Sequence, residues 1–153
     1  MRMSFPLLSA SLLALVLAFG CASAPMATPE RDTAAKTFAP VPDKAVVYVY
    51  RDETFGAAIK IPIVINGRII GDTVSKSYFR IVMEPGNCEV QCKASSDSTQ
   101  SVKVEAGKVY FLRQEMKMGM WAAGCMMHLM TEAEGRAAIA ECKLIDAPET
   151  LPK

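Results

Sequence analysis

The sequence predicts a mainly β protein, an antiparallel β-sandwich with one C-terminal α-helix. Three observations support this class. Short runs of β-branched and aromatic residues recur over residues 45–130, turn residues separate these runs at regular spacing, and a capped helical stretch follows them. We expect the domain to span residues 45–146 of the 153-residue chain, which is long enough to bury a core of its own.

The first predicted strands carry the clearest patterns. Residues 45–51 (AVVYVYR) are apolar on both faces, which indicates a central strand. Over residues 59–65, isoleucine occupies every second position, and Pro62 predicts an edge strand or a bulge because proline has no N–H to donate. Asn66-Gly67 then separates two apolar runs and predicts a two-residue hairpin turn, since both residues tolerate positive φ.

The remainder of the domain continues this pattern and ends in a helix. Further strands are expected over residues 78–83, 88–92, 99–104, 108–115 and 124–130. Thr131 and Glu134 fit a capping box that starts a helix reaching about Cys142, with Ala138, Ile139 and Cys142 facing the sheet. Residues 147–153 contain two prolines and are expected to form a tail.

Residues 1–20 have the features of a secretory signal peptide. Arg2 precedes an apolar run that is shorter than the roughly 20 residues of a membrane span. The run ends in Ala18-Phe19-Gly20-Cys21, which resembles the lipobox of bacterial lipoproteins, so we expect cleavage before Cys21 and its modification with lipid, including palmitate. An ordinary signal-peptidase site at Ala22-Ser23-Ala24 is the alternative, but it would place Pro25 directly after the cut, where cleavage is poor.

The location of the protein follows from this interpretation. Ala22 stands where aspartate holds many lipoproteins at the inner membrane, so the resemblance implies an outer-membrane lipoprotein whose domain faces the periplasm. Residues 21–44 are rich in proline and are expected to form a flexible tether between the lipid and the domain. Without Arg2, 16 basic residues balance 16 acidic ones. This neutral balance gives no electrostatic basis for nucleic acid binding. It also gives no basic surface for anionic lipid, so membrane attachment relies on Cys21.

A series of short motifs occurs in an order that resembles a known family. The motifs are Tyr48-Val49-Tyr50-Arg51, Asn66-Gly67-Arg68-Ile69-Ile70-Gly71, Ser77-Tyr78-Phe79, Glu84-Pro85-Gly86, Val104-Glu105-Ala106-Gly107-Lys108-Val109-Tyr110 and Glu132-Ala133-Glu134-Gly135-Arg136. Over about residues 44–145, the chain resembles the small bacterial lipoproteins grouped as domain of unknown function 2846, and residues 63–115 resemble the PEGA-type β-sandwich in spacing. The resemblance implies a β-sandwich on a lipid anchor, with no assigned activity and no catalytic residues to transfer.

Four cysteines besides Cys21 are disulfide candidates in an oxidising compartment: Cys88, Cys92, Cys125 and Cys142. Cys88 and Cys92 lie four residues apart on one predicted strand, roughly 13 Å, which is too far for a bond between them. Two pairings remain, and we prefer Cys88–Cys125 with Cys92–Cys142 over Cys88–Cys142 with Cys92–Cys125. The alternative for some of these cysteines is a buried free thiol.

The segment over residues 116–130 is rich in groups that bind soft metals. Its candidate ligands are Met116, Met118, Met120, Cys125, Met126 and His128, the only histidine. Thioether, thiolate and imidazole groups suit Cu(I), so a periplasmic Cu(I)-binding protein is the alternative function. Methionines on a strand also commonly fill gaps in a core, and exposure of these side chains with Trp121 would favour a binding surface.

Enzymatic activity is not expected. A single histidine leaves few acid–base schemes, and the sequence has no nucleophile elbow, zinc-protease motif or Gly-rich phosphate loop. We therefore expect a lipid-anchored envelope protein of unassigned activity and without a cofactor. Its role would be that of an interaction or structural module that presents a sheet face or loops to an envelope partner.

Overall fold

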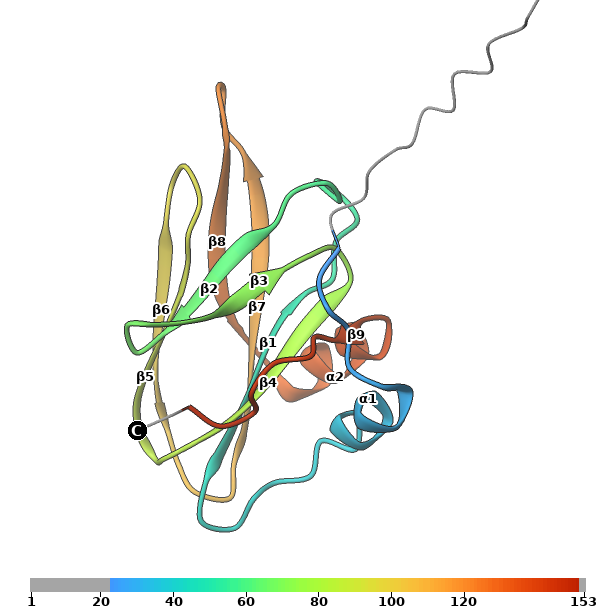
Figure 1. The fold of residues 1–153 in the computed structure, drawn as a ribbon. Coiled ribbons are helices and arrows are strands. Elements are labelled where there is room, and N and C mark those ends of the chain that lie inside the picture. Colours follow the sequence, from blue (N-terminus) through green and yellow to red (C-terminus); the bar gives the residue numbers. More distant parts are fainter. Residues whose placement is uncertain (1–22, 152–153) are drawn as a thin grey trace, which may run out of the picture.

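The structure, a computed structural model, describes residues 23–151. Two β-sheets pack face to face, and two helices lie against the outer face of the larger sheet (Figure 1). The predicted β-sandwich with a C-terminal helix is confirmed. None of the helices within residues 23–151 is long and apolar enough to cross a membrane.

The larger sheet has five strands in the order β8-β7-β1-β4-β9. These are β1 (Ala45–Arg51), β4 (Ser77–Met83), β7 (Val109–Met118), β8 (Ala123–Met130) and β9 (Lys143–Leu144). β1 lies in the middle, antiparallel to β4 and parallel to β7, and its whole length is buried. The central strand predicted from two apolar faces is therefore confirmed.

The smaller sheet is antiparallel and has four strands in the order β3-β2-β5-β6. These are β2 (Ile61–Ile65), β3 (Arg68–Thr73), β5 (Gly86–Cys92) and β6 (Ser98–Val104). The predicted turn is present between β2 and β3, where Asn66 and Gly67 have φ of 48° and 77°.

The position of β2 decides between the two alternatives for Pro62. An edge strand is wrong, because β2 pairs with β3 on one side and β5 on the other. The predicted bulge is supported by a register shift between Ile63 and Val64 in the β2–β3 pairing. The strand tolerates the proline because the ladder to β5 begins at Ile63, so Pro62 is not required to donate to it.

An aliphatic inner core lies between the two sheets. Its strand residues are Ala45, Val47, Val49, Ile61, Ile63, Ile65, Phe79, Ile81, Met83, Cys88, Val90, Cys92, Val104, Leu112, Met116, Cys125 and Met127. Successive side chains of a strand point to opposite faces, so the period-two pattern that predicts the strands also selects these residues.

An aromatic outer core lies between the five-stranded sheet and the helices. Its members are Ala35, Phe38, Val46, Tyr48, Tyr50, Tyr78, Phe111, Ile139, Cys142 and Leu144. Tyr48 stacks on Phe111 with ring centroids 5.4 Å apart, and Phe38 packs against both rings. β1 is apolar on both faces because one face contributes to each core.

Residues 23–44 do not form the flexible tether that the sequence predicts. Residues Pro29–Ala35 form helix α1, with Thr28 as its N-cap and Pro29 in its first turn. After the helix, Phe38 adopts a positive φ of 54° and is buried in the outer core. The domain therefore begins well before residue 45.

Polar contacts hold α1 and the residues before it in place. The backbone N–H of Ala27 donates to the Leu144 carbonyl of β9 at 2.9 Å. The Asp32 carboxylate accepts from the Tyr78 hydroxyl at 2.8 Å and from the backbone N–H of Leu144 at 2.9 Å. Lys36 Nζ donates to Asp32 at 2.8 Å. This segment is ordered by these hydrogen bonds together with the burial of Ala35 and Phe38 in the outer core.

Helix α2 (Glu132–Ala140) begins at the predicted capping box. Thr131 Oγ1 accepts from the backbone N–H of Glu134, whose carboxylate accepts from the backbone N–H of Thr131. Ile139 is buried against the sheet, as expected. A Cβ on Gly135 would lie 2.3 Å from a ring atom of Phe111, so glycine is required for the close approach of the helix to β7.

The C-terminal residues that the structure describes continue along the edge of the larger sheet. The backbone N–H of Val82 in β4 donates to the Glu149 carbonyl, and the Glu149 carboxylate pairs with Arg31 and Arg80. The predicted tail is therefore attached to the fold as far as Leu151.

Candidate functional site

The connections between strands gather at two ends of the sandwich. We call one the hairpin end, where the β1–β2 loop (residues 52–60), the β5–β6 loop (93–97) and the β7–β8 turn (119–122) lie. We call the other the groove end, where the Asn66-Gly67 turn and the β4–β5 connection (84–85) lie. The β7–β8 hairpin extends beyond the other loops (Figure 1).

The tip of the β7–β8 hairpin carries a cluster of exposed apolar side chains. Met118 is 71% exposed, Met120 89% and Trp121 93%. Phe55 of the β1–β2 loop, at the same end, is 51% exposed. Scattered apolar residues are ordinary on protein surfaces, but several large ones on one projecting turn indicate an interaction surface. We call Phe55, Met118, Met120 and Trp121 the apical patch.

Arg51, the last residue of β1, fixes the loop that carries Phe55. Its buried guanidinium donates to the backbone carbonyls of Phe55, Gly56 and Ile59, each at 2.8 Å. Burial lowers the pKa of Arg51 from its usual value, and the Glu53 carboxylate 3.5 Å from its Nε opposes this shift. The β1–β2 loop is therefore folded around a buried cation.

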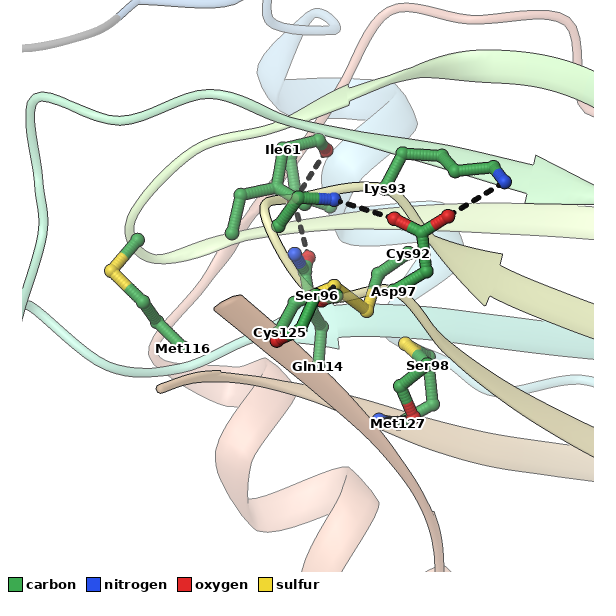
Figure 2. The surroundings of a disulfide bond; sticks show 12 residues. Ile61, Cys92, Lys93, Ser96, Asp97, Ser98, Gln114, Met116, Cys125 and Met127 are labelled. Carbon is green, nitrogen blue, oxygen red and sulfur yellow. Dashed lines mark hydrogen bonds and ion pairs between the residues drawn. A yellow bond between two sulfur atoms is a disulfide. The ribbon is translucent and has the colours of Figure 1, made fainter. Parts of the chain in front are cut away.

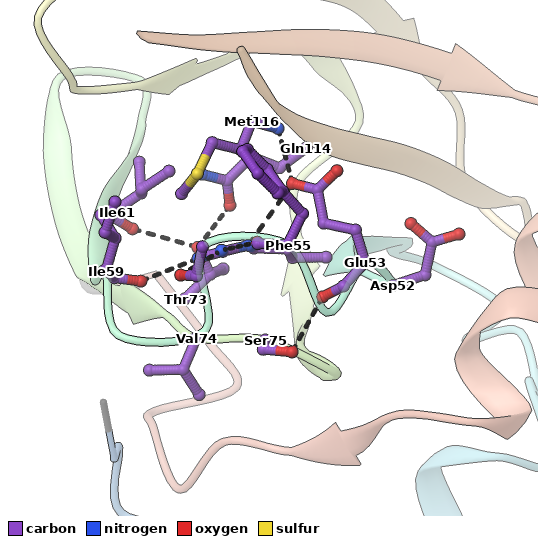
Figure 3. Close-up of polar contacts among 12 residues, drawn as sticks. Asp52, Glu53, Phe55, Ile59, Ile61, Thr73, Val74, Ser75, Gln114 and Met116 are labelled. Carbon is purple, nitrogen blue, oxygen red and sulfur yellow. Dashed lines mark hydrogen bonds and ion pairs between the residues drawn. The ribbon is translucent and has the colours of Figure 1, made fainter. Parts of the chain in front are cut away.

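Glu53 connects this loop to the β7–β8 hairpin. Figure 3 shows Glu53 between Ser75, whose hydroxyl donates to its carbonyl at 2.8 Å, and Met116, whose backbone N–H donates to its carboxylate at 2.6 Å. A Cβ on Gly56 would lie 2.2 Å from the Met116 sulfur, so the loop and β7 are in close contact. Glu53 and Gly56 therefore connect the loop that carries Phe55 to β7, the strand that carries Met118.

A disulfide joins the two sheets beneath the hairpin. It links Cys92 at the end of β5 to Cys125 near the start of β8 (Figure 2). Beside it, the backbone N–H of Cys125 donates to the Ser96 carbonyl at 3.1 Å, and Asp97 accepts from Lys93 Nζ at 2.8 Å. The disulfide therefore fixes the β5–β6 loop against the base of the hairpin.

The preferred cysteine pairing is wrong. Cys92 bonds to Cys125, and Cys88 and Cys142 are buried free thiols. Cys142 lies in the outer core, on the opposite side of the five-stranded sheet from the other three, which explains why it cannot pair with them. Burial raises the pKa of the Cys88 thiol to about 11 and that of Cys142 to about 12, so both thiols stay protonated at neutral pH.

The six predicted copper ligands do not come together at one point. Met116 and Cys125 belong to the inner core, and Cys125 is in the disulfide. Met126 and His128 alternate with Cys125 and Met127 along β8 and therefore face the other side of the sheet. His128 Nε2 lies 2.8 Å from the Glu115 carboxylate. Copper binding stays a prediction from the sequence, and this geometry does not strengthen it.

Met118 and Met120 are the two members of the predicted ligand set that are exposed at the hairpin tip. Within residues 23–151, no group of three or more His, Cys, Asp or Glu side chains is placed to hold a metal ion. The structure therefore separates the Met-rich segment into a buried strand part and an exposed turn. The exposure of the turn with Trp121 is the observation that favours a binding surface.

A groove of about 480 Å³ lies at the groove end. It is lined by Lys44, Asn66, Arg68, Val82, Met83, Glu84, Pro85, Gly86, Asn87, Thr150 and Leu151. Lys44 is paired with Glu84, whose hydrogen bond raises the pKa of the lysine, whereas Arg68 makes no ion pair with the residues that the structure describes. Clefts of this size with an apolar floor and a few polar groups are typical ligand sites.

The predicted signal peptide and the predicted lipidation site at Cys21 lie outside the described residues. Ala24 is the first residue that packs against the inner core. It lines a pocket of about 240 Å³ together with Lys60, directly before β2, and Asp72, the second-last residue of β3. The described chain therefore starts near the hairpin end.

The fold and its surface define a small β-sandwich with an apolar hairpin tip at one end and a groove at the other. Residues 42–125 match the family described as "Protein of unknown function (DUF2846)", and the chain belongs to this family, as the motif order predicts. It is similar to an uncharacterized protein of Haemophilus influenzae, with 31% identity over 131 residues covering 84% of this chain and 78% of that protein. No solved structure matches the chain.

Sequence reasoning did not identify two of these features. The role of Arg51 was hidden because its partners are backbone carbonyls of a loop. A charged residue at the end of a strand that is buried on both faces nevertheless indicates a buried cation with polar partners. The groove was hidden because its lining comes from four separate segments between residues 44 and 151.

Proposed function

We propose that this protein is a lipid-anchored component of the bacterial cell envelope that acts as a non-enzymatic binding module. In this proposal Cys21 carries the lipid and the groove end receives the partner. The observation that carries the proposal is the groove itself, whose lining shares no residue with the pocket beside Ala24, where the chain arrives from Cys21. An anchor attached beside Ala24 therefore does not occupy the groove.

The groove lining supports a partner of mixed character. Val82, Met83 and Leu151 offer apolar contacts, and Arg68 at the rim is a cation without an ion pair among the described residues. A guanidinium binds a carboxylate through two parallel hydrogen bonds, so it adds direction to an otherwise apolar contact. The partner class that fits is a protein segment with an acidic residue or chain terminus next to apolar side chains.

The use of the polar side chains supports a binding role rather than catalysis. Arg51 and Glu53 hold the β1–β2 loop, and Asp32 holds α1 to the sheet. The two free thiols are buried and have raised pKa values, which does not suit a nucleophile. These groups have structural partners that account for their positions.

The anchor is tested by the chemistry of Cys21. We expect the N-terminal peptide of the mature protein to start at Cys21, to carry acyl chains by mass spectrometry, and to incorporate labelled palmitate. Cys21→Ser should abolish labelling and move the protein from the membrane to the soluble fraction. A Cys21→Ser protein that still fractionates with membranes would contradict the anchor.

The groove is tested by site-specific crosslinking in intact cells. A photo-crosslinking residue at position 87, on the groove, should capture one dominant partner, whereas the same residue at position 99, exposed on β6, should not. Arg68→Glu should reduce the yield severalfold, and Lys143→Glu, an exposed charge reversal on β9, should leave it unchanged. Equal capture from both positions would reject the groove as the partner site.

A further inference from the structure

We propose that the hairpin end docks on the surface of a phospholipid bilayer, with Trp121, Met120, Met118 and Phe55 entering the interfacial layer. This inference rests on the proposed lipid anchor at Cys21, and it names the surface against which that anchor holds the domain. The protein would then touch the membrane at two places, the acylated cysteine and the apical patch.

The first step is the length of chain between the anchor and the fold. Ala24 already packs against the inner core, and Pro25 accepts a hydrogen bond from the backbone N–H of Asp146 at 2.8 Å. Only two residues, Ala22 and Ser23, separate Cys21 from Ala24, and three residue steps of extended chain span at most about 11 Å. A lipid on Cys21 therefore holds the folded domain directly on the bilayer, without the spacing that a flexible tether of 24 residues would give.

The second step is the end of the domain that faces the bilayer. Ala24 lines one pocket with Lys60 and Asp72, and Asp72 pairs with Pro62 at the start of β2. The Pro62 carbonyl accepts from the backbone N–H of Lys93 in the β5–β6 loop. That loop is fixed to the base of the β7–β8 hairpin by the Cys92–Cys125 disulfide. The anchor point and the hairpin are thus at the same end.

The third step is how far the hairpin projects. β1 and β7 run parallel with Tyr50 opposite Arg113, so β1 ends one residue later while β7 continues to Met118. At about 3.4 Å per residue, Met118 lies on the order of 14 Å beyond the end of β1. The tip therefore projects beyond the other loops of the hairpin end (Figure 1). A domain held by so short a chain can tilt on its lipid and bring this projecting tip to the bilayer surface.

The fourth step is the chemistry of the tip. Trp121 and Met120 are almost fully exposed, at 93% and 89%, and indole is the side chain that most favours the interface between headgroups and acyl chains. Lys117 at the base of the tip pairs with Glu115. Since the mature chain is neutral, attraction to anionic headgroups adds little, and the contact depends on apolar burial.

The apical patch is already ordered before it binds, because contacts hold the β1–β2 loop and the β7–β8 hairpin in place. Arg51 holds the β1–β2 loop through three carbonyls, Glu53 joins that loop to β7, and the disulfide fixes the opposite side of the hairpin. A surface that is already ordered loses little conformational entropy on docking. Docking through a few side chains is weak for the free domain. The lipid keeps the apical patch at a high local concentration near the bilayer, which raises the overall affinity.

The test uses Trp121, the only tryptophan of the chain, as a fluorescent reporter. The mature chain from Cys21 is coupled through that thiol to a maleimide phospholipid in phosphatidylethanolamine–phosphatidylglycerol vesicles. Coupling is selective because the other cysteines are bonded or buried. This attachment does not depend on acylation in the cell, so a failure of the docking proposal is distinct from a failure of the proposed anchor.

We expect the emission of Trp121 to shift to shorter wavelength by about 10 nm or more on coupling, and brominated lipid to quench at least half of it. Met118→Ser with Met120→Ser should reduce the quenching at least twofold. Ile69→Ser, which removes a 77% exposed isoleucine from β3, is the matched control and should leave it unchanged.

Two results would overturn the proposal. One is a vesicle-bound protein whose Trp121 keeps the emission of a water-exposed indole and is not quenched. The other is an emission shift that also occurs in the uncoupled Cys21→Ser protein and grows with protein concentration, because the patch would then bind a second copy of the chain. In either case the labelling of Cys21 in cells would still decide the anchor separately.

Discussion

The inner and outer cores share β1 but are held together in different ways. The inner core is aliphatic and is crosslinked by Cys92–Cys125. The outer core is aromatic, and its tyrosines also bond to α1, with the Tyr48 hydroxyl donating to the Ala35 carbonyl at 2.6 Å. Sheet-on-sheet packing follows from strand alternation, whereas helix-on-sheet packing in this protein requires particular hydrogen bonds and a glycine. Five predictions test these differences between the two cores.

The largest effect is expected from Phe111→Ala, which removes the central ring of the outer core. The ring stacks on Tyr48 and packs against Phe38, so its loss should lower the free energy of unfolding by about 3–5 kcal/mol. Denaturant unfolding measures this change. Leu129→Ala, a 48% exposed position on β8, is the control and should change stability by about 0.5 kcal/mol or less. A loss below about 1 kcal/mol for Phe111→Ala would mean that the helices add little to stability.

The next effect concerns the inner core alone. Cys92→Ala with Cys125→Ala removes a disulfide between cysteines 33 residues apart in the sequence. We expect the free energy of unfolding to fall by about 3–4 kcal/mol. Reductant should destabilise the wild-type protein and leave the double variant unchanged, as measured by thermal unfolding. If Cys142→Ala also removes the effect of reductant, the pairing seen in the structure is incorrect.

The number of free thiols can also be measured directly. Without reductant, alkylation of the native domain should leave Cys88 and Cys142 unmodified, since both are buried and have raised pKa values. Alkylation after unfolding without reductant should modify both, and Cys92 and Cys125 should react only after reduction. Four reactive thiols in the unreduced, unfolded protein would exclude the disulfide.

Gly135→Ala tests the close approach of α2 to β7. Helix propensity alone favours alanine by about 1 kcal/mol, but the new Cβ would lie 2.3 Å from Cγ and 2.4 Å from Cδ1 of Phe111. We therefore expect a net loss of about 1–3 kcal/mol. The loss should be smaller in a Phe111→Ala background, where both ring atoms are absent. Stabilisation by Gly135→Ala in the wild-type background would show that the helix is free to move away.

Asp32→Asn tests the polar part of the outer core and its pH dependence. Burial opposes ionisation of Asp32, but hydrogen bonds from Lys36, Tyr78 and the Leu144 backbone outweigh it and lower the pKa of the carboxyl. The ionised form therefore stabilises the fold above the unfolded pKa of about 4, and this contribution is lost as the pH falls through the folded pKa. The variant should lose about 1–2 kcal/mol at pH 7, and its difference from wild type should shrink below about pH 4. A constant difference from pH 7 to pH 2 would assign the effect to packing.

The two helices show how far the sequence predicts this fold. α2 was predictable because Thr131 and Glu134 form a capping box directly after an apolar strand. α1 has seven residues and no apolar stripe, and the prolines around it suggested a coil. Thr28-Pro29-Glu30 is nevertheless a recognisable helix start, with a capping hydroxyl, a proline in the first turn and an acidic residue. The long-range contacts that retain α1 have no local signal.

The cysteines likewise show that local sequence patterns do not predict contacts between distant segments. Strand alternation correctly places Cys88 and Cys92 on one face, and spacing excludes a bond between them. The choice of Cys92 as the partner of Cys125 depends on which ends of β5 and β8 coincide, and that follows from the order of strands in two sheets. Exposure of the Met118–Trp121 turn likewise depends on β7 extending past β1, which no pattern within β7 indicates.

The pairing of residues 25–27 with residues 144–146 has a consequence for the order of events during biogenesis. Contacts separated by more than one hundred residues form late, because the intervening loop must close first. In the proposed envelope setting, a chain threaded out from its N-terminus would leave the residues after Cys21 unpaired until its last ten residues had emerged. The maturation enzymes would then meet an open peptide, and folding itself would withdraw that peptide once it had been modified.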